Sequence, residues 1–126
     1  MKKIINTPNA PAPIGPYNQA VLVGDMLYTS GQIAINPQNN ELVLDDIQSE
    51  TTMVMENVKA VLAAAAMDFS DVIKCTIFIS DMNDFALINE VYGRYFTSDF
   101  PARETVQVAC LPKNVNVEIS VIATKN

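Results

Sequence analysis

Residues 72–80, VIKCTIFIS, are rich in β-branched side chains and apolar on both alternating faces. Such a run is typical of a strand in the middle of a sheet, because both faces of a central strand are buried. In residues 45–67, apolar side chains recur at three- and four-residue spacing, which predicts a long amphipathic helix before the strand. After the strand, residues 80–84 offer capping side chains for a second helix. The core stripe of that helix is formed by Phe85, Ile88, Tyr92 and Tyr95.

Further strands are expected on both sides of this central unit. Residues 18–23 and 26–30 flank Gly24-Asp25, a pair that favours a hairpin, and residues 103–111 and 115–124 alternate with period two. The proline-rich residues 7–16 form an extended segment that cannot pair as a central strand. The expected order is β-β-α-β-α-β-β, an α+β fold with a mixed sheet in one domain spanning residues 1–126.

Two helices of this size can cover only one face of such a sheet. The other face must be solvated or buried in an oligomer. Charged residues make up only 17% of the chain and apolar residues 49%. A low charge content favours burial, so we expect a homo-oligomer.

The composition excludes several chemistries. The chain has 126 residues, no histidine and a net charge of −6, from eight Lys+Arg against fourteen Asp+Glu. Without histidine there is no Ser-His-Asp or Cys-His nucleophile and no histidine-ligated metal. A pI of about 4.4 argues against binding to nucleic acid or to an anionic membrane surface.

The two cysteines, Cys75 and Cys110, lie outside any CxxC motif, which suits reduced thiols in the core. The sequence has no signal-peptide pattern and no apolar run of 18 residues, so we expect a cytoplasmic protein.

The strongest candidate site residues are Arg103 and Glu118. Strand alternation places Arg103 with Thr105 and Gln107 on a polar face, and Glu118 lies between apolar Val117 and Ile119. If the two strands pair, Arg103 and Glu118 could approach each other, and a guanidinium suits a substrate carboxylate. An ordinary surface or interface ion pair is the more common explanation of such spacing.

Three other positions are weaker candidates. Ser30-Gly31 offers a hydroxyl and a closely approachable backbone, Tyr17 could border a pocket, and Asn89 could donate from a helix flank. An ordinary turn is the more common explanation of Ser30-Gly31, Tyr17 could equally be a packing residue, and Asn89 could be an ordinary amide on the flank of the helix. Paired aspartates at 45–46 and at 81 and 84 are better explained as helix-start residues than as metal ligands.

Several motifs together resemble one known family. The segments PARETVQV at 101–108, Leu111-Pro112 and Val117-Glu118-Ile119 are similar to the signature of the RidA (YjgF) reactive imine deaminase family. Asn9-Ala10-Pro11, residues 14–17, 29–33, 56–58, 81–85 and 89–92 follow in the family's order. The resemblance implies a chorismate-mutase-like fold that assembles as a homotrimer, with sites at the subunit interfaces.

The resemblance also implies a reaction: hydrolysis of reactive 2-enamine or 2-imine acids, such as 2-aminoacrylate, to 2-keto acids and ammonia. By position, Arg103 would bind the substrate carboxylate and Glu118 would orient the attacking water. No metal or organic cofactor is implied. The pocket would be completed by Tyr17, Ser30, Gly31, Asn89 and the backbone N–H of Thr105. A different class of function, a trimer that binds 2-keto acids or other small carboxylates without turnover, would use the same pocket.

Overall fold

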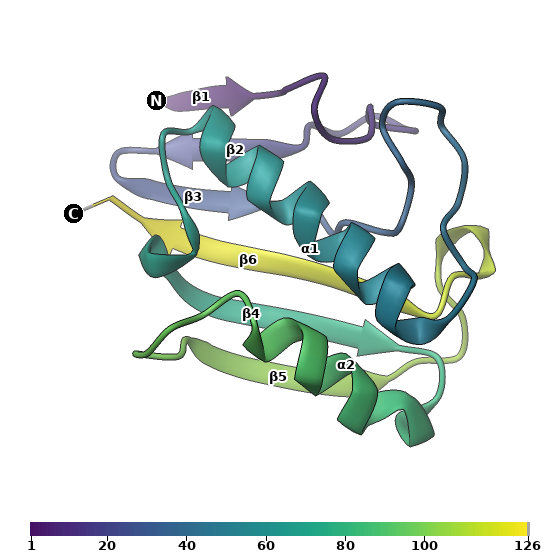
Figure 1. The fold of residues 1–126 in the computed structure, drawn as a ribbon. Helices are drawn as coiled ribbons and strands as arrows, with labels where there is room; N and C mark the ends of the chain where they lie inside the picture. Colours follow the sequence, from purple (N-terminus) through teal and green to yellow (C-terminus); the bar gives the residue numbers. More distant parts are fainter. Residues whose placement is uncertain (126) are drawn as a thin grey trace.

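A single six-stranded sheet, covered on one face by two helices, forms the computed structural model, which describes residues 1–125 (Figure 1). The strand order is β1-β2-β3-β6-β4-β5. Only β4 and β5 run parallel, and the other neighbours are antiparallel. The elements are β1 (Lys2–Ile5), β2 (Ala20–Val23), β3 (Met26–Thr29), α1 (Ile47–Ala64), β4 (Val72–Ile79), α2 (Phe85–Gly93), β5 (Ala102–Gln107) and β6 (Val117–Thr124). The predicted α+β class, with a mixed sheet and both helices on one face, is confirmed.

Three details differ from the sequence prediction. Strand β1 was not expected, because two of its four residues are lysines, yet it pairs with β2 at the edge of the sheet. The helix predicted to end near residue 67 stops at Ala64, since Ala66 adopts a left-handed conformation with φ of 58°. The strand predicted for residues 103–111 leaves the sheet after Gln107, which leaves Cys110 exposed rather than in the core, while Cys75 is buried as expected.

The central strand behaves as its sequence predicts. Strand β4 lies between β6 and β5, and Cys75, Ile77 and Ile79 point into the core beneath the helices. Helix α1 packs against this face, which β6 completes. The large buried apolar side chains that α1 and β6 contribute are Val54, Met55, Val58, Val61, Leu62, Val117, Ile119 and Val121. Burying side chains of this size stabilises the fold by about 1.5–3 kcal/mol each.

Two of the four aspartates expected at helix starts, Asp46 and Asp81, form caps, whereas Asp84 at the start of α2 makes no side-chain cap bond. The side chain of Asp46 accepts a hydrogen bond of 2.7 Å from the Ser49 N–H at the start of α1. That bond lowers the pKa of Asp46. Asp81 accepts one of 2.9 Å from the Asn83 N–H in the short 3-10 turn before α2. Among residues 1–125, no helix combines the length and the apolarity needed to span a membrane.

A buried carboxylate connects α1 to the start of β6. Glu50 is 1% exposed and accepts hydrogen bonds from the backbone N–H of Asn116 (2.7 Å), the Asn116 side-chain amide (2.7 Å) and the N–H of Val117 (3.2 Å). These donors satisfy a carboxylate that would otherwise be costly to bury.

Replacing Glu50 with alanine is expected to lower the free energy of unfolding by about 3 kcal/mol, because buried donors lose their acceptor. Urea denaturation measures the change. Glu90→Ala is the matched control, since Glu90 pairs with Arg94 on the surface (2.6 Å) and such pairs contribute less than about 1 kcal/mol. Equal losses in the two variants would contradict the role of Glu50.

The sheet face opposite the helices, which we call the open face, is unusually apolar. Ile4, Val23, Tyr28 and Val106 project from it and are between 42% and 48% exposed. The charged strand residues on this face are Lys2, Lys74, Glu104 and Glu118, of which Lys74 and Glu104 pair at 3.1 Å. Sheet faces that stay in water are normally polar. The open face therefore exposes more apolar surface than a solvated sheet face normally does.

Candidate functional site

Four of the predicted site residues meet in one pocket. A cavity of about 340 Å³ lies beside the open face, where β3 ends and β6 begins. Its walls are largely apolar, with a single carboxylate among them. The lining residues are Ile14, Tyr17, Ser30, Gly31, Ile33, Pro112 and Glu118.

Backbone pairing beyond β3 brings these residues together. The N–H of Gln32 donates to the carbonyl of Ile119 (2.8 Å), and the N–H of Ile119 donates to the carbonyl of Gln32 (3.1 Å). This bridge extends the contact between the two chain segments past the end of β3. It places Gly31 directly against Glu118.

Gly31 is needed because no side chain fits there. A Cβ atom at this position would overlap with Oε2 of Glu118 and lie 2.6 Å from its Cδ. The backbone at residue 31 therefore approaches the carboxylate as closely as only glycine allows. The prediction that Ser30-Gly31 offers a close backbone approach to the site agrees with this geometry.

Gly31→Ala is expected to displace the Glu118 side chain and to lower the free energy of unfolding by about 1–3 kcal/mol through overpacking. A crystal structure would show the displacement, and the pKa of Glu118, followed by NMR, should fall as the carboxylate gains solvent. Gly93→Ala is the control, because a Cβ at Gly93 meets nothing within 4 Å. An unmoved Glu118 in the Gly31 variant would contradict the packing described.

The environment of Glu118 suits a general base. Burial raises the pKa of the Glu118 carboxyl above its ordinary value. Within residues 1–125 no hydrogen-bond donor reaches this carboxylate, so both of its oxygens remain available to a ligand or water. A desolvated carboxylate in a pocket is a common feature of acid–base sites.

The remaining pocket residues have partly structural roles. The Ser30 hydroxyl donates to the carbonyl of Asn18 at 2.6 Å, so it can offer a ligand only its acceptor lone pairs while that bond is kept. The Tyr17 hydroxyl accepts from the Ile14 N–H at 3.3 Å, and its side chain is largely exposed at the pocket mouth.

The sequence analysis missed Gln19, which shapes the pocket wall from behind. It is 2% exposed, and its side-chain amide donates to the carbonyls of Thr7, Ala10 and Pro11 at 2.8–3.2 Å. Its Oε1 accepts from the Thr7 N–H at 2.7 Å. One buried amide thus fixes the proline-rich segment that leads to Ile14 and Tyr17. A lone glutamine before a hairpin carries no sequence signal for this role.

Arg103 lies elsewhere, and the expected approach of Arg103 to Glu118 within one chain is wrong. Strand β4 separates β5 from β6, so the two strands do not pair. The register pairs Arg103 with Cys75, which faces the helices, whereas Glu118 is paired with Phe78 and belongs to the open face. The sequence analysis placed Arg103 on a polar face of β5, and in the structure helix α2 covers that face.

Asn89 and Thr105 accompany Arg103 rather than Glu118. Nη1 of Arg103 donates to Oδ1 of Asn89 at 2.6 Å. Thr105 follows two residues later on the same face, and its Oγ1 is buried with no hydrogen bond to the described part of the chain. The seven predicted site residues therefore form two groups: a pocket group around Glu118 and a guanidinium group around Arg103.

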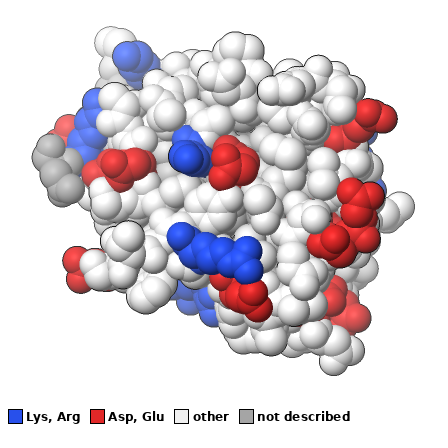
Figure 2. All heavy atoms as spheres, in the orientation of Figure 1, with Lys and Arg blue, Asp and Glu red and all other residues white. Residues whose placement is uncertain are grey.

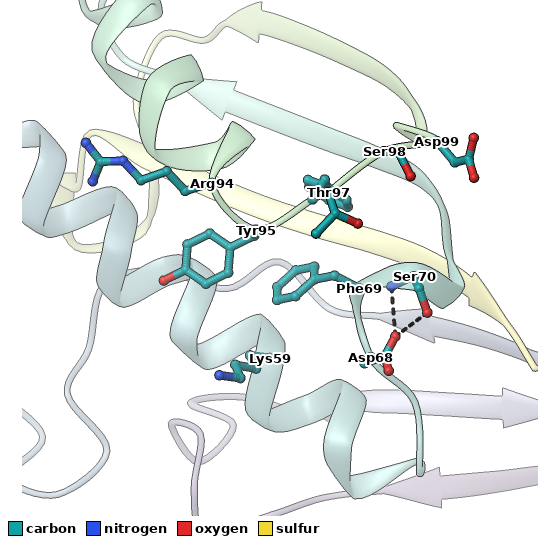
Figure 3. Close-up of a pocket in the computed structure, with 10 residues that line it drawn as sticks. Lys59, Asp68, Phe69, Ser70, Arg94, Tyr95, Thr97, Ser98 and Asp99 are labelled. Atoms are coloured by element: carbon teal, nitrogen blue, oxygen red, sulfur yellow. Dashed lines mark hydrogen bonds between the residues drawn. The ribbon is translucent and has the colours of Figure 1, made fainter.

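A second cavity contains none of the predicted residues. It measures about 540 Å³ and is lined by Lys59, residues 68–70 and residues 94–99 (Figure 3). The Asp68 carboxylate accepts a hydrogen bond from the Ser70 N–H, and the ring centroids of Phe69 and Tyr95 lie 5.2 Å apart. Several of its polar groups are engaged within the chain, since Tyr95 donates to Glu56 at 2.6 Å and Arg94 pairs with Glu90. Residues 1–125 also contain no group of three side chains suited to hold a metal ion.

Fold and site together define a class: a small α+β protein with an apolar open sheet face and a glycine-backed carboxylate pocket. The chain belongs to the RidA/YjgF/TdcF family, because the family model described as "Endoribonuclease L-PSP" matches residues 7–125. It is 50% identical to "Putative reactive intermediate deaminase TdcF" of Escherichia coli K12 over 129 aligned positions, covering 100% of this chain and 99% of that protein.

Solved structures agree with this assignment. The structure of E. coli TdcF with bound serine has a TM-score of 0.95 and 49% identity, and the match covers 98% of this chain and 99% of that one. RidA from the Antarctic bacterium Psychrobacter sp. PAMC 21119 gives a TM-score of 0.94 at 41% identity, over 98% of this chain and 99% of that one. The resemblance stated from the sequence motifs is confirmed.

Proposed function

We propose that this protein is a hydrolytic deaminase that converts 2-imino and 2-enamino acids, such as 2-aminoacrylate, to 2-keto acids and ammonia. The observation that carries the proposal is the unbonded, desolvated Glu118 carboxylate held against Gly31 in a small pocket. The relative named as a reactive intermediate deaminase, at 50% identity over the full chain, supports the same chemistry.

The active site is proposed to be shared between protomers of a homotrimer. Glu118 belongs to the open face, whereas Arg103 stands at the edge strand β5 under α2. Neither group is complete alone: the pocket lacks a cation for a substrate carboxylate, and Arg103 lacks a base. An interface that covers the open face brings the Glu118 pocket of one protomer to the Arg103 edge of its neighbour. The exposed apolar side chains of that face supply the association energy.

In this site the two groups divide the reaction. The Arg103 guanidinium binds the substrate carboxylate and fixes the adjacent C2 atom. Water adds through its oxygen to C2 of the imine while Glu118 accepts one water proton. Glu118 passes that proton to the nitrogen, the proton of the new C2 hydroxyl follows it, and ammonia leaves as the C–N bond breaks and the C2 oxygen becomes a carbonyl. An enamine substrate must first gain a proton at C3 to become the imine. One water is consumed for each 2-keto acid and ammonia released.

A carboxylate-binding protein without turnover is the second candidate. The serine bound to E. coli TdcF in its solved structure favours it, since serine carries a carboxylate and an amino group on one carbon. Both candidates predict binding that depends on Arg103. Only the deaminase accelerates release of 2-keto acid and ammonia when a serine or threonine dehydratase supplies the intermediate, and an unaccelerated reaction would leave only the binding function.

The description of the family model as an endoribonuclease is not adopted for this chain. RNA binding depends on clustered Lys and Arg, and this chain has eight such residues against fourteen acidic ones. On the helix-covered side, blue and red groups are scattered among uncharged atoms and form no continuous basic patch (Figure 2).

The pH dependence of kcat/KM is expected to follow Glu118. The carboxylate must be deprotonated to accept a proton, and burial raises its pKa. Activity is therefore full above that raised value and is lost as the pH falls through it. A pH profile of keto acid release checks this, with substrate supplied at each pH. A rate that stays constant down to the ordinary pKa of a glutamate would contradict Glu118 as the base.

A further inference from the structure

Three side chains of α2 converge on Arg103. Phe85, Asn89 and Tyr92 are spaced four and three residues apart and so lie on one stripe of the helix. The Arg103 guanidinium carbon lies 5.5 Å from the ring centroid of Phe85 and 5.1 Å from that of Tyr92. Asn89 accepts from Nη1 at 2.6 Å. An arginine on an edge strand thus has its guanidinium held by two rings and an amide.

This arrangement differs from an ordinary surface arginine. Arg94, the other arginine of the chain, pairs with Glu90 at 2.6 Å. Arg103 has no carboxylate partner among residues 1–125. Ring faces attract a cation without neutralising it. The charge of Arg103 is therefore held in place but left uncompensated.

The contacts also leave one edge of the guanidinium free. Asn89 bonds to Nη1, while Nε and Nη2 donate to no group in the described part of the chain. Those two N–H groups point the same way and match the two oxygens of a carboxylate. A ligand carboxylate can bind there without displacing Asn89.

We infer that Phe85 and Tyr92 are positioning residues, whose ring faces hold Arg103 so that its Nε–Nη2 edge is presented to a substrate carboxylate. The inference rests on the proposed function for the identity of the ligand. The ring of Tyr92 acts, rather than its hydroxyl, because the ring centroid lies 5.1 Å from the Arg103 guanidinium carbon, whereas the hydroxyl interacts with the buried Cys75. A guanidinium that is already fixed in place loses less side-chain conformational entropy when it binds a ligand carboxylate.

Direct observation of Arg103 tests the inference. Because the chain has two arginines, its arginine Nε–H NMR spectrum has two signals, which Arg94→Lys assigns. In the wild type, Arg103 Nε–H should be ordered on the nanosecond timescale. Phe85→Leu and Tyr92→Leu should each make it mobile and weaken pyruvate binding about five- to tenfold, as expected for the loss of one cation–π contact.

Two controls separate positioning from folding. Tyr92→Phe keeps the ring and should leave both the Arg103 signal and the Kd for pyruvate within about twofold of the wild type. Ile88→Val alters the buried face of α2 and should likewise leave Arg103 ordered. An Arg103 that stays ordered, with unchanged pyruvate affinity, in both leucine variants would overturn the inference.

The test distinguishes this inference from the proposed function. If the wild type releases no keto acid but the leucine variants mobilise Arg103, the positioning role stands and the deaminase proposal fails. If both leucine variants retain an ordered Arg103, tight pyruvate binding and full turnover, the positioning role fails and the deaminase proposal stands. Should pyruvate not bind to the wild type, the mobility of Arg103 Nε–H still decides the positioning role.

Discussion

Arg103→Ala is expected to lower kcat/KM for 2-keto acid release by at least about a hundredfold, because the bidentate, charge-assisted hydrogen bonds to the substrate carboxylate are lost. The effect should fall on KM and kcat together, since the same contact aligns C2 for attack by water. A coupled assay with a serine dehydratase as the source of 2-aminoacrylate measures it.

Arg94→Ala serves as the matched control, because Arg94 is the only other arginine and it pairs with Glu90 on the surface, not with any predicted site residue. It should leave kcat/KM within about twofold of the wild type. Arg103→Lys should recover only part of the loss, since a lysine ammonium cannot present two parallel N–H groups. Full activity in Arg103→Ala would remove Arg103 from the site.

Glu118→Gln is expected to lower kcat by about 10²- to 10⁴-fold, the usual contribution of a general base. Binding of pyruvate should change much less, because the carboxylate contact belongs to Arg103. Single-turnover measurements alongside pyruvate titration separate the two effects. A variant that keeps its rate but loses binding would assign Glu118 to ligand affinity instead of proton transfer.

The same substitution should stabilise the fold at neutral pH. The pKa of Glu118 is raised in the folded state, so its contribution to stability is present below the unfolded-state pKa and lost as the pH rises through the folded value. A neutral glutamine avoids that loss. Urea denaturation should show the gain at pH 7 and its disappearance in acid. A gain in stability with a loss of activity is typical of a residue that serves function at a cost in stability.

The fold was largely predictable because apolar residues recur with the regular spacing of strands and helices in most of its elements. Alternation in residues 117–124 identifies the buried and open faces of β6 correctly, and the helical stripe in α1 identifies its buried side. Strand β1, which pairs with β2, was missed because Lys2 and Lys3 do not fit the apolar pattern that predicts a strand. Strand order depends on how the crossovers pack, which local periodicity does not record. The insertion of β4 between β5 and β6 therefore could not be predicted from the motifs.

The geometry that surrounds the candidate residues could be predicted only in part. Tyr17, Ser30, Gly31 and Glu118 lie in one pocket, and Gly31 approaches Glu118 as closely as only glycine allows. The position of Arg103 was misjudged, because strand alternation shows which residues share a face but not which helix covers that face. Phe85 and Tyr92 were visible at helical spacing but interpreted as core. Their role depends on β5 lying under α2, which only the three-dimensional structure reveals.

The most direct test of a shared active site is subunit complementation. Arg103→Ala and Glu118→Gln chains, co-expressed in equal amounts with different tags, form mixed oligomers that native mass spectrometry can verify. If each site takes Arg103 from one protomer and Glu118 from its neighbour, random mixing leaves about one quarter of the sites intact. The mixture should then recover about a quarter of wild-type activity, although each variant alone is inactive. Mixed oligomers with no recovered activity would contradict the shared site.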